Sequence, residues 1–241
     1  MNSPKKASPE QLEKLGAHAA AFVQPNDRVG LGSGKAALAF VRALGKRVQT
    51  QRLSIVGIAT SLLTEQVARD AGIPLATLEQ IETLDIAVDG ADEVDPHFNL
   101  IKGGGGNLAR EKVTESIAKR LIIVVGEEKL VQQLGTSFPV FIECIDFAKP
   151  VILRKLSAMG ASVIERKNPD GSPFLTDNGN PYLEAKFHTH GPGSSALIQD
   201  PAALDRTLHA IPGILDTGLF IHMADEILIA HATGQIEHRI K

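Results

Sequence analysis

The sequence predicts an α/β protein with a Rossmann-like parallel sheet, helices on both faces of that sheet, and a smaller ferredoxin-like α+β domain. In the first half, short β-branched apolar runs alternate with amphipathic helical patterns, which is typical of right-handed βαβ crossovers. The second half has the order β-α-β-β-α-β of a ferredoxin-like unit. We therefore expect residues 1–133 and 219–241 to form a Rossmann-like catalytic domain, and residues 134–218 a small domain that is a possible oligomer contact.

The elements of the first half follow from apolar periodicity and from stop signals. A helix at 35–46 carries its apolar residues at the spacing of one helical face, and a helix at 61–70 is stopped by Gly72-Ile73-Pro74. One predicted strand ends at Leu31, and three others cover 53–58, 84–88 and 121–125. A third helix is predicted at 107–119. Ligands of parallel sheets lie beyond the carboxyl ends of the strands, so the loops after these strands are the candidate sites.

The second half is predicted from shorter segments around a turn-rich insert, 168–180. The predicted elements are a strand at 139–145, a helix at 149–159, strands at 161–166 and 182–188, a helix at 201–210, and strands at 214–220, 226–230 and 235–240.

Composition excludes several classes of function. The chain has 241 residues, 43% hydrophobic and 22% charged, with a net charge of −3, which indicates a soluble globular protein without a general basic face. Aromatic residues make up only 4%, which argues against base-stacking platforms. No run approaches 18 apolar residues and no signal-peptide pattern is present. We therefore expect a cytoplasmic protein with neither a nucleic-acid nor a membrane partner.

Metal-ligating patterns are sparse. Cys144 is the only cysteine, which excludes an internal disulfide and a multi-cysteine zinc site. His188 and His190 would share one face of a strand, which leaves a metal pair open as an alternative to an exposed edge, although no third ligand accompanies them.

The first candidate segment is a glycine loop that follows the strand ending at Leu31. It reads Gly30-Leu31-Gly32-Ser33-Gly34-Lys35-Ala36 and is called the first glycine loop below. Its N–H groups and the following helix N-terminus favour an anion such as phosphate. A Walker A loop is excluded by Val29 and Ala36, and a dinucleotide fingerprint by Lys35 and the lack of a downstream acid. The alternative is a plain tight turn.

The second candidate segment places four acids in seven residues after the strand at 84–88. It reads Asp89-Gly90-Ala91-Asp92-Glu93-Val94-Asp95. Because Asp89 directly follows the apolar run, we expect its side chain to be partly buried and oriented. A solvated acidic loop and a magnesium site are the alternatives.

The third candidate segment is Lys102 followed by Gly103-Gly104-Gly105-Gly106, the second glycine loop, and then by a helix that carries Glu111. Its backbone would wrap a small ligand, and we expect it to move. An ammonium and a carboxylate that flank such a loop suit proton transfer beside a developing oxyanion. The alternative is that Lys102 and Glu111 are solvated surface charges, with Glu111 and Glu115 on an outer helix face.

Together, the three segments resemble ribose-5-phosphate isomerase of the A type, from the first helix to Lys241. Two later stretches add to the resemblance: 175–180, and 211–214 with 218–220. The resemblance implies interconversion of ribose 5-phosphate and ribulose 5-phosphate through an enediol in the pentose phosphate pathway. It also implies no metal, no organic cofactor, and a homodimer or homotetramer.

The same resemblance implies the roles of individual residues. Glu111 matches the general base, Asp89 matches the acid/base of ring opening, and Lys102 matches the residue that stabilises the oxyanion. The implied substrate-binding residues are Gly32, Ser33, Gly34, Lys35, Ala36, Asp89, Gly90, Asp92, Lys102, Gly103, Gly104 and Lys129.

The sequence departs from the family in two places. Lys35 and Ala36 stand where the family usually has hydroxyl groups that bind phosphate, and we expect the Lys35 ammonium to act there as a point charge. The family's Asp-x-Ser-Lys becomes Gly126-Glu127-Glu128-Lys129, which keeps only the lysine.

Two other functions fit a similar sheet: a CoA-transferase-like enzyme and a sugar-phosphate-sensing regulator. The segment before Val29 is too short for the helix-turn-helix that such regulators usually carry. The joint presence of Asp89, Lys102 and Glu111 also favours an enzyme.

Overall fold

The computed structural model describes residues 6–187 and 198–241 and divides them into two compact units. The first unit comprises the chain up to Ala91, Arg110–Leu130 and Met223–Lys241; the second comprises Asp92–Ala109 and Val131–His222. These units differ from the predicted domains mainly in Asp92–Ala109. That segment falls in the second unit because two short strands within it pair with β11 (Leu219–Phe220).

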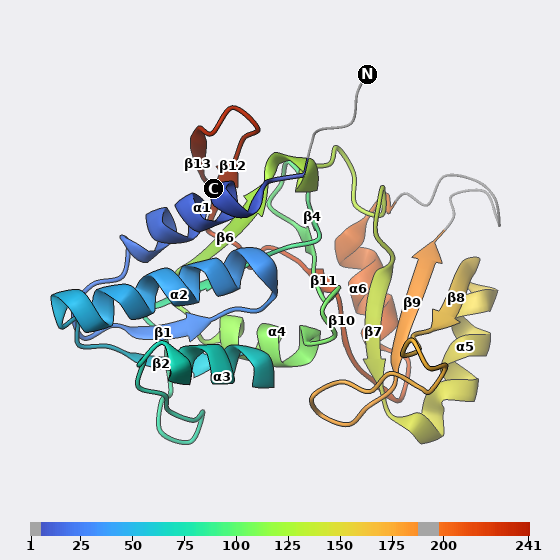
Figure 1. Cartoon of the computed structure of the whole chain (residues 1–241). Coiled ribbons are helices and arrows are strands. Elements are labelled where there is room, and N and C mark those ends of the chain that lie inside the picture. Colours follow the sequence, from blue (N-terminus) through green and yellow to red (C-terminus); the bar gives the residue numbers. More distant parts are fainter. Residues whose placement is uncertain (1–5, 188–197) are drawn as a thin grey trace. The chain divides into compact units, whose positions relative to one another are not determined.

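A six-stranded sheet forms the centre of the first unit, with the order β13-β12-β6-β3-β1-β2 (Figure 1). Its strands are β1 (Arg28–Leu31), β2 (Val56–Ala59), β3 (Ile86–Asp89), β6 (Leu121–Gly126), β12 (Glu226–Ala230) and β13 (Ile236–Ile240). Neighbouring strands are parallel except for the β12–β13 hairpin. All six residues of β6 are buried, as expected of a parallel strand covered on both faces.

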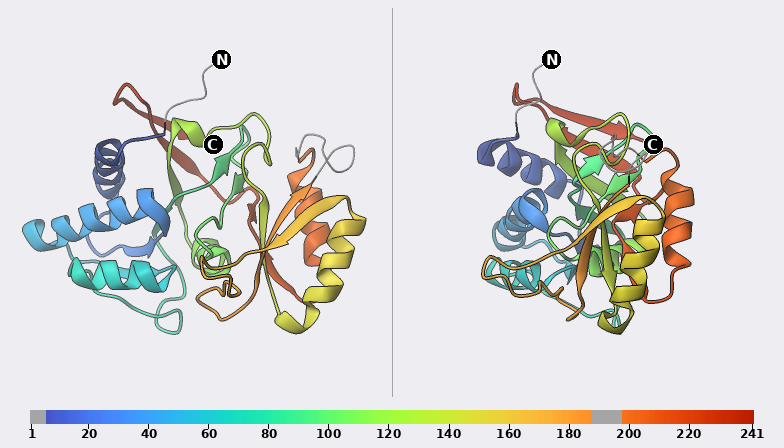
Figure 2. Two further views of the ribbon diagram at one scale, coloured as in Figure 1. Left: turned by 45° about the vertical axis from the view of Figure 1, so that its right-hand side comes forward. Right: turned by 90° about the vertical axis from the view of Figure 1, so that its right-hand side faces the viewer.

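Three helices cover one face of this sheet: α1 (Pro9–Ala20), α2 (Gly34–Gln51) and α3 (Leu62–Asp70). Leu15, Phe40 and Ala68 of these helices share a core with Val88 of β3. α1 lies beside α2 in every view (Figures 1 and 2). On the other face, residues 117 and 118, which follow α4 (Leu108–Ser116), pack with residues 58, 81 and 84. The predicted parallel sheet with helices on both faces is confirmed.

The strand order creates a topological switch point between β1 and β3. The chain passes from β1 to β2 on one side, and then returns to β3 on the other side of β1. In open α/β sheets, ligands bind outside the carboxyl ends of the strands at such a point. Leu31 and Val88 pair near these ends, so the first glycine loop and Asp89 emerge side by side.

The second unit contains a four-stranded antiparallel sheet with the order β10-β7-β9-β8. Its elements are β7 (Val140–Cys144), the 3-10 helix η2 (Asp146–Ala148), α5 (Lys149–Ala158), β8 (Ala161–Glu165), β9 (Tyr182–Phe187), α6 (Pro201–His209) and β10 (Ile214–Thr217). In the left view of Figure 2, α5 and α6 lie on the same side of this sheet. The connectivity is that of a ferredoxin-like unit, as the sequence predicted. His188 and His190 lie outside the described residues.

A three-stranded sheet in the second unit was not predicted. It joins β4 (Glu93–Val94), β5 (Leu100–Ile101) and β11 in the order β11-β5-β4. The predicted strand at 214–220 was wrong because it breaks at Gly218 into β10 and β11. A Cβ on Gly218 would lie 2.3 Å from the Lys102 carbonyl oxygen, so only glycine fits this break. In the part of the chain that the structure describes, no helix combines the length and apolar character needed to cross a bilayer.

Candidate active site

The first glycine loop turns tightly against β3. Gly32 N donates to the Val88 carbonyl oxygen at 3.0 Å, and Ser33 N donates to Asp89 Oδ1 at 2.8 Å. A Cβ on Gly32 would lie 2.5 Å from Asp89 Cα, so this close approach of two main chains requires glycine. Gly34 has a φ of +79°, which glycine adopts without strain.

Asp89 is the last residue of β3 and is 1% exposed. Its Oδ1 also accepts a hydrogen bond from Gly90 N at 2.6 Å. Because two N–H groups, of Ser33 and Gly90, bind the same carboxylate oxygen, the side chain has one fixed orientation at the switch point. The expected buried and oriented Asp89 is confirmed, and a freely solvated side chain is ruled out.

Glu111 lies in the first turn of α4 and is 4% exposed. The Ser33 hydroxyl donates a hydrogen bond to Glu111 Oε1. Ser33 occupies the N-cap position of α2, where a serine commonly caps the helix, but its hydroxyl makes no capping bond here. Within the first unit, the structure thus brings together Ser33, Asp89 and Glu111. Glu115 is also 4% exposed, so an outer, solvated helix face for these two glutamates is wrong.

The start of α2 leaves its first N–H groups without a side-chain cap. Gly34 and Lys35 are exposed there, and Ala36 is half-buried. An uncapped helix N-terminus attracts anions, because its N–H groups and the helix dipole both favour negative charge. This part of the first glycine loop can therefore receive a phosphate group.

The second unit holds four further predicted site residues: Asp92, Lys102, Gly103 and Gly104. Asp92 Oδ2 accepts a hydrogen bond from Gly104 N at 2.7 Å, and Gly103 has a φ of +107°. Lys102 is 2% exposed, and its Nζ lies 5.2 Å from the ring centroid of Phe220. A lysine with this exposure is not a solvated surface charge, so that alternative is wrong. The face of the Phe220 ring attracts a cation placed over it.

The other two acids of the acidic segment hold loops in place. Glu93 is fully buried and accepts hydrogen bonds from the N–H groups of Gly135, Ser137 and Phe138. Asp95 accepts hydrogen bonds from His97 N at 2.8 Å and from Asn99 N at 2.9 Å. The sequence pattern alone does not separate these structural acids from Asp89 and Asp92, because all four precede or follow similar apolar residues.

Lys129 ends the 3-10 helix η1 (Glu127–Lys129), which follows β6, and is half-buried. The two glutamates before it have structural contacts. Glu127 Oε2 lies 2.7 Å from His231 Nδ1, and this hydrogen bond lowers the pKa of Glu127. Glu128 Oε2 accepts a hydrogen bond from Ala7 N at 3.3 Å. The two glutamates that depart from the family pattern therefore bind the segment before α1 and the loop between β12 and β13.

Sequence reasoning missed Tyr182 and Arg166, which contact the second glycine loop. The Tyr182 hydroxyl donates to the Gly103 carbonyl oxygen, and Arg166 Nη1 donates to the Gly104 carbonyl oxygen at 2.9 Å. These pairs are separated by 79 and 62 residues, so no local pattern could have revealed them.

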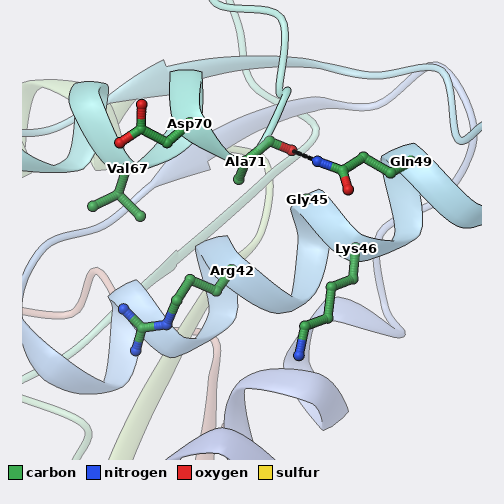
Figure 3. Close-up of a pocket in the computed structure, with 7 residues that line it drawn as sticks. All are labelled: Arg42, Gly45, Lys46, Gln49, Val67, Asp70 and Ala71. Carbon is green, nitrogen blue, oxygen red and sulfur yellow. Dashed lines mark hydrogen bonds between the residues drawn. The ribbon is translucent and has the colours of Figure 1, made fainter.

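A groove of about 400 Å³ lies between α2 and α3, away from these residues (Figure 3). It is lined by Arg42, Gly45, Lys46, Gln49, Val67, Asp70 and Ala71. None of the predicted site residues lines it. No group of three metal-ligating side chains occurs in residues 6–187 and 198–241. Burial raises the pKa of the Cys144 thiol to about 11, which keeps this thiol protonated.

Comparison with known proteins gives a consistent result. Residues 56–234 match the family model of ribose 5-phosphate isomerase A (phosphoriboisomerase A). The ribose-5-phosphate isomerase A of Thermosynechococcus vestitus is 43% identical, over 91% of this chain and 91% of that protein. The corresponding Pyrococcus abyssi protein is 40% identical, over 93% of this chain and 96% of its own length.

Solved structures agree with the sequence matches. A D-ribose-5-phosphate isomerase in complex with phospho-erythronic acid superposes with a TM-score of 0.90 and 36% identity, covering 98% of this chain and 100% of that one. The ribose 5-phosphate isomerase of Plasmodium falciparum gives 0.89 and 34%, with coverage of 97% and 99%. By sequence and by fold, this chain belongs to the ribose 5-phosphate isomerase A family.

Proposed function

We propose that this protein interconverts ribose 5-phosphate and ribulose 5-phosphate through an enediolate, with Glu111 as the general base. The observation that carries this proposal is the buried trio of Ser33, Asp89 and Glu111 at the switch point of the parallel sheet. Two carboxylates at the edge where ligands of such sheets bind are suited to proton transfer, and family membership supplies the substrate.

The reaction moves protons within one sugar. Glu111 removes the proton from C2 of the open-chain aldose, and the electron pair forms a C1–C2 double bond while O1 becomes negatively charged. The proton is then delivered to C1, and the O2 hydroxyl proton passes to O1, which leaves a carbonyl group at C2. A positioned base of this kind accelerates proton transfer by about 10²–10⁴-fold. The Ser33 hydroxyl keeps the Glu111 carboxylate in a single orientation.

The other residues of the acidic segment and of the second glycine loop bind the sugar in this proposal. Asp89 exchanges the proton needed to open the ring, because its carboxylate is held by Ser33 and Gly90 in one orientation. Lys102 neutralises the enediolate, which is worth about 10²–10³-fold for a preorganised donor. Asp92 and the backbone of Gly103 and Gly104 bind the sugar hydroxyl groups.

The phosphate group is assigned to the first glycine loop. Gly32, Ser33 and Gly34 bring the backbone to the start of α2, and the N–H groups of the first helical turn face an anion. The family usually has hydroxyl groups at the positions of Lys35 and Ala36. Here the Lys35 ammonium supplies a positive charge to the phosphate in their place. Lys129, after the neighbouring strand β6, is the second cation assigned to the substrate.

The first experiment is an isomerase assay on ribose 5-phosphate in the presence of EDTA, with wild-type protein and Glu111→Gln. We expect EDTA-resistant activity that falls by at least 100-fold in the variant. Glu79→Gln, which removes the charge of an exposed glutamate in the loop after α3, is the control and should match wild type.

Four outcomes would argue against the proposal. Inactive wild-type protein would favour a sensing regulator, and transfer of CoA between acyl groups would favour the CoA-transferase-like alternative. A Glu111→Gln enzyme with more than a tenth of wild-type activity would remove the assignment of the base. Activity that is lost when EDTA is added would contradict the proposal that the reaction needs no metal ion.

We infer further that the protein is a homodimer or homotetramer, with the second unit as a subunit contact. Ile145, Phe147, Val151 and Leu215 are exposed apolar residues of that unit, and Phe147 is 94% exposed. Exposed apolar groups of this kind often mark protein contacts. Light scattering should give two or four times the chain mass, and Phe147→Asp should reduce it. A monomeric wild-type protein would exclude this assignment.

A further inference from the structure

Arg166, the residue directly after β8, is hydrogen-bonded to four neighbouring residues. Its Nε donates to Glu184 Oε1 at 2.7 Å, and its Nη1 donates to the Gly104 carbonyl oxygen at 2.9 Å. Its backbone N–H donates to the Tyr182 carbonyl oxygen at 2.9 Å, and its carbonyl oxygen accepts from Phe174 N at 3.0 Å. Only 18% of the side chain is exposed. Both the main chain and the side chain of Arg166 are thereby fixed.

Three aromatic rings surround the Arg166 guanidinium group. Its Cζ lies 5.1 Å from the Phe141 ring centroid, 5.3 Å from that of Phe174 and 4.8 Å from that of Tyr182. Phe141 and Phe174 each lie 5.8 Å from Tyr182, so the rings also pack on one another. A planar guanidinium stacks on aromatic faces and directs its N–H groups in a rigid fork. The fork is therefore aimed at the Gly104 carbonyl oxygen by its surroundings.

These contacts set the orientation of two peptide groups in the second glycine loop. The carbonyl and N–H groups of a trans peptide point in opposite directions. The Gly103–Gly104 peptide is held at both ends, because its carbonyl accepts from Tyr182 and its N–H donates to Asp92. The next peptide is held by its carbonyl on Arg166, which directs the N–H of Gly105 to the opposite side.

The loop needs such restraints because glycine has the largest conformational freedom to lose. Gly103 and Gly106 adopt φ values of +107° and +89°, and Phe174 packs so closely that a Cβ on Gly106 would lie 2.5 Å from its ring. Arg166, Tyr182 and Phe174 thus hold the loop in one conformation. The predicted movement of this loop stays a prediction.

We propose that Arg166 is a positioning residue of the isomerase, which acts through the Gly104 carbonyl group. It fixes the peptide planes that follow Lys102, and with them the backbone groups that receive the sugar. The inference rests on the proposed function, which assigns the second glycine loop to the substrate. Because the phosphate is assigned to the first glycine loop, loss of Arg166 should reduce kcat more than it raises KM.

The test compares Arg166→Ala with Arg154→Ala, which removes an exposed arginine of α5 in the same unit. We expect kcat of Arg166→Ala to fall by about 10-fold or more with less than a threefold change in KM, while Arg154→Ala matches wild type. Guanidinium ions at millimolar concentration should restore part of the lost activity, because they can fill the aromatic cage and bind the same carbonyl. Arg166→Lys should be intermediate, since an ammonium lacks the planar fork.

A second variant covers the case in which Arg166→Ala fails to fold. Tyr182→Phe removes only the hydroxyl group on the Gly103 carbonyl oxygen and should lower kcat several-fold. Activity of Arg166→Ala above half of wild type, or full activity of Tyr182→Phe, would overturn the inference. The inference would also be overturned if the activity of Arg166→Ala fell only in proportion to its folded fraction and guanidinium ions did not restore it. Wild-type protein that is inactive on ribose 5-phosphate would instead overturn the proposed function itself.

Discussion

The two glycine loops require glycine for different reasons. In the first loop, a Cβ on Gly32 would collide with the main chain of the neighbouring strand, at 2.5 Å from Asp89 Cα, as well as with the Asp89 carboxyl group. In the second loop, side chains from distant positions make the closest contacts, with Tyr182 on Gly103 and Phe174 on Gly106. The pairing of strands in the sheet determines the first loop, whereas side chains that a mutation can shorten determine the second.

This difference predicts how each loop responds to substitution. A contact between main chains cannot be relieved by another mutation, because the pairing of β1 with β3 sets it. A contact with a side chain can be relieved by shortening that side chain. The difference between the loops can therefore be tested with two glycine substitutions in each loop.

The largest effect is expected for Gly32→Ala in the first loop. Its Cβ would lie 2.3 Å from Asp89 Cγ and 2.5 Å from Asp89 Cα, and overpacking against main chain costs about 3 kcal/mol. A Cβ on Gly34 would point into open space, but Gly34 has a φ of +79°. Gly34→Ala should therefore lower the stability only by the cost of a left-handed alanine, about 1–2 kcal/mol. Urea denaturation followed by circular dichroism measures both. Equal losses of stability would refute a main-chain origin for the first loop.

The second loop is tested with Gly106→Ala and Gly105→Ala. Gly106 has a φ of +89° and faces the Phe174 ring, so alanine there should cost about 2 kcal/mol. A Cβ on Gly105 has its nearest contact at 3.6 Å, so alanine there should cost less than about 0.5 kcal/mol. Phe174→Leu should relieve part of the Gly106→Ala loss, in a double-mutant cycle. Additive losses in the cycle would show that Phe174 does not shape the loop.

The same difference explains how much the sequence predicted. The first glycine loop and Asp89 follow apolar strands directly, so their place at the carboxyl edge followed from strand order alone. The contacts of the second loop depend on Tyr182 of β9 and on Arg166, directly after β8, which are distant in the sequence and have ordinary surroundings there. β4 and β5 were missed, and β11 was not separated from β10, because two-residue strands carry no periodicity.

The burial of Lys102 and Glu111 also could not be derived from local sequence. Lys102 precedes and Glu111 follows the second glycine loop, and the exposure of both depends on tertiary packing. Both side chains are nearly inaccessible in the structure. The resemblance to a family identified these residues, whereas periodicity alone left them as possible surface charges.

The two units are also expected to respond differently to pH, beginning with acid in the first unit. Asp85 accepts hydrogen bonds from Arg28 and Lys119, which hold the pKa of this carboxyl group well below its ordinary value of 3.8. A lowered pKa stabilises the fold above about pH 3.8, and this contribution is lost as the pH falls further.

Asp85→Asn should therefore lower the stability by about 1–2 kcal/mol at pH 7 and by less at pH 3. Urea denaturation at both pH values, followed by circular dichroism, measures the difference. Asp70→Asn, on the exposed surface of α3, is the control. A loss that is the same at both pH values would exclude ionic stabilisation at Asp85.

The second unit should instead lose stability in alkali, and by less than the first unit loses in acid. Hydrogen bonds to Asp205 and Asp216 raise the pKa of His209 to about 10. A raised pKa stabilises the fold fully below the ordinary value of 6.5, and the contribution is lost as the pH rises from there through about 10. The His209 side chain is 39% exposed, so solvent screening limits the effect to about 1 kcal/mol. Urea denaturation at pH 6 and pH 10.5, followed by circular dichroism, measures the difference. Wild type should exceed His209→Gln in stability at pH 6 and match it at pH 10.5, and a difference that persists in alkali would assign the His209 contact to packing instead of charge.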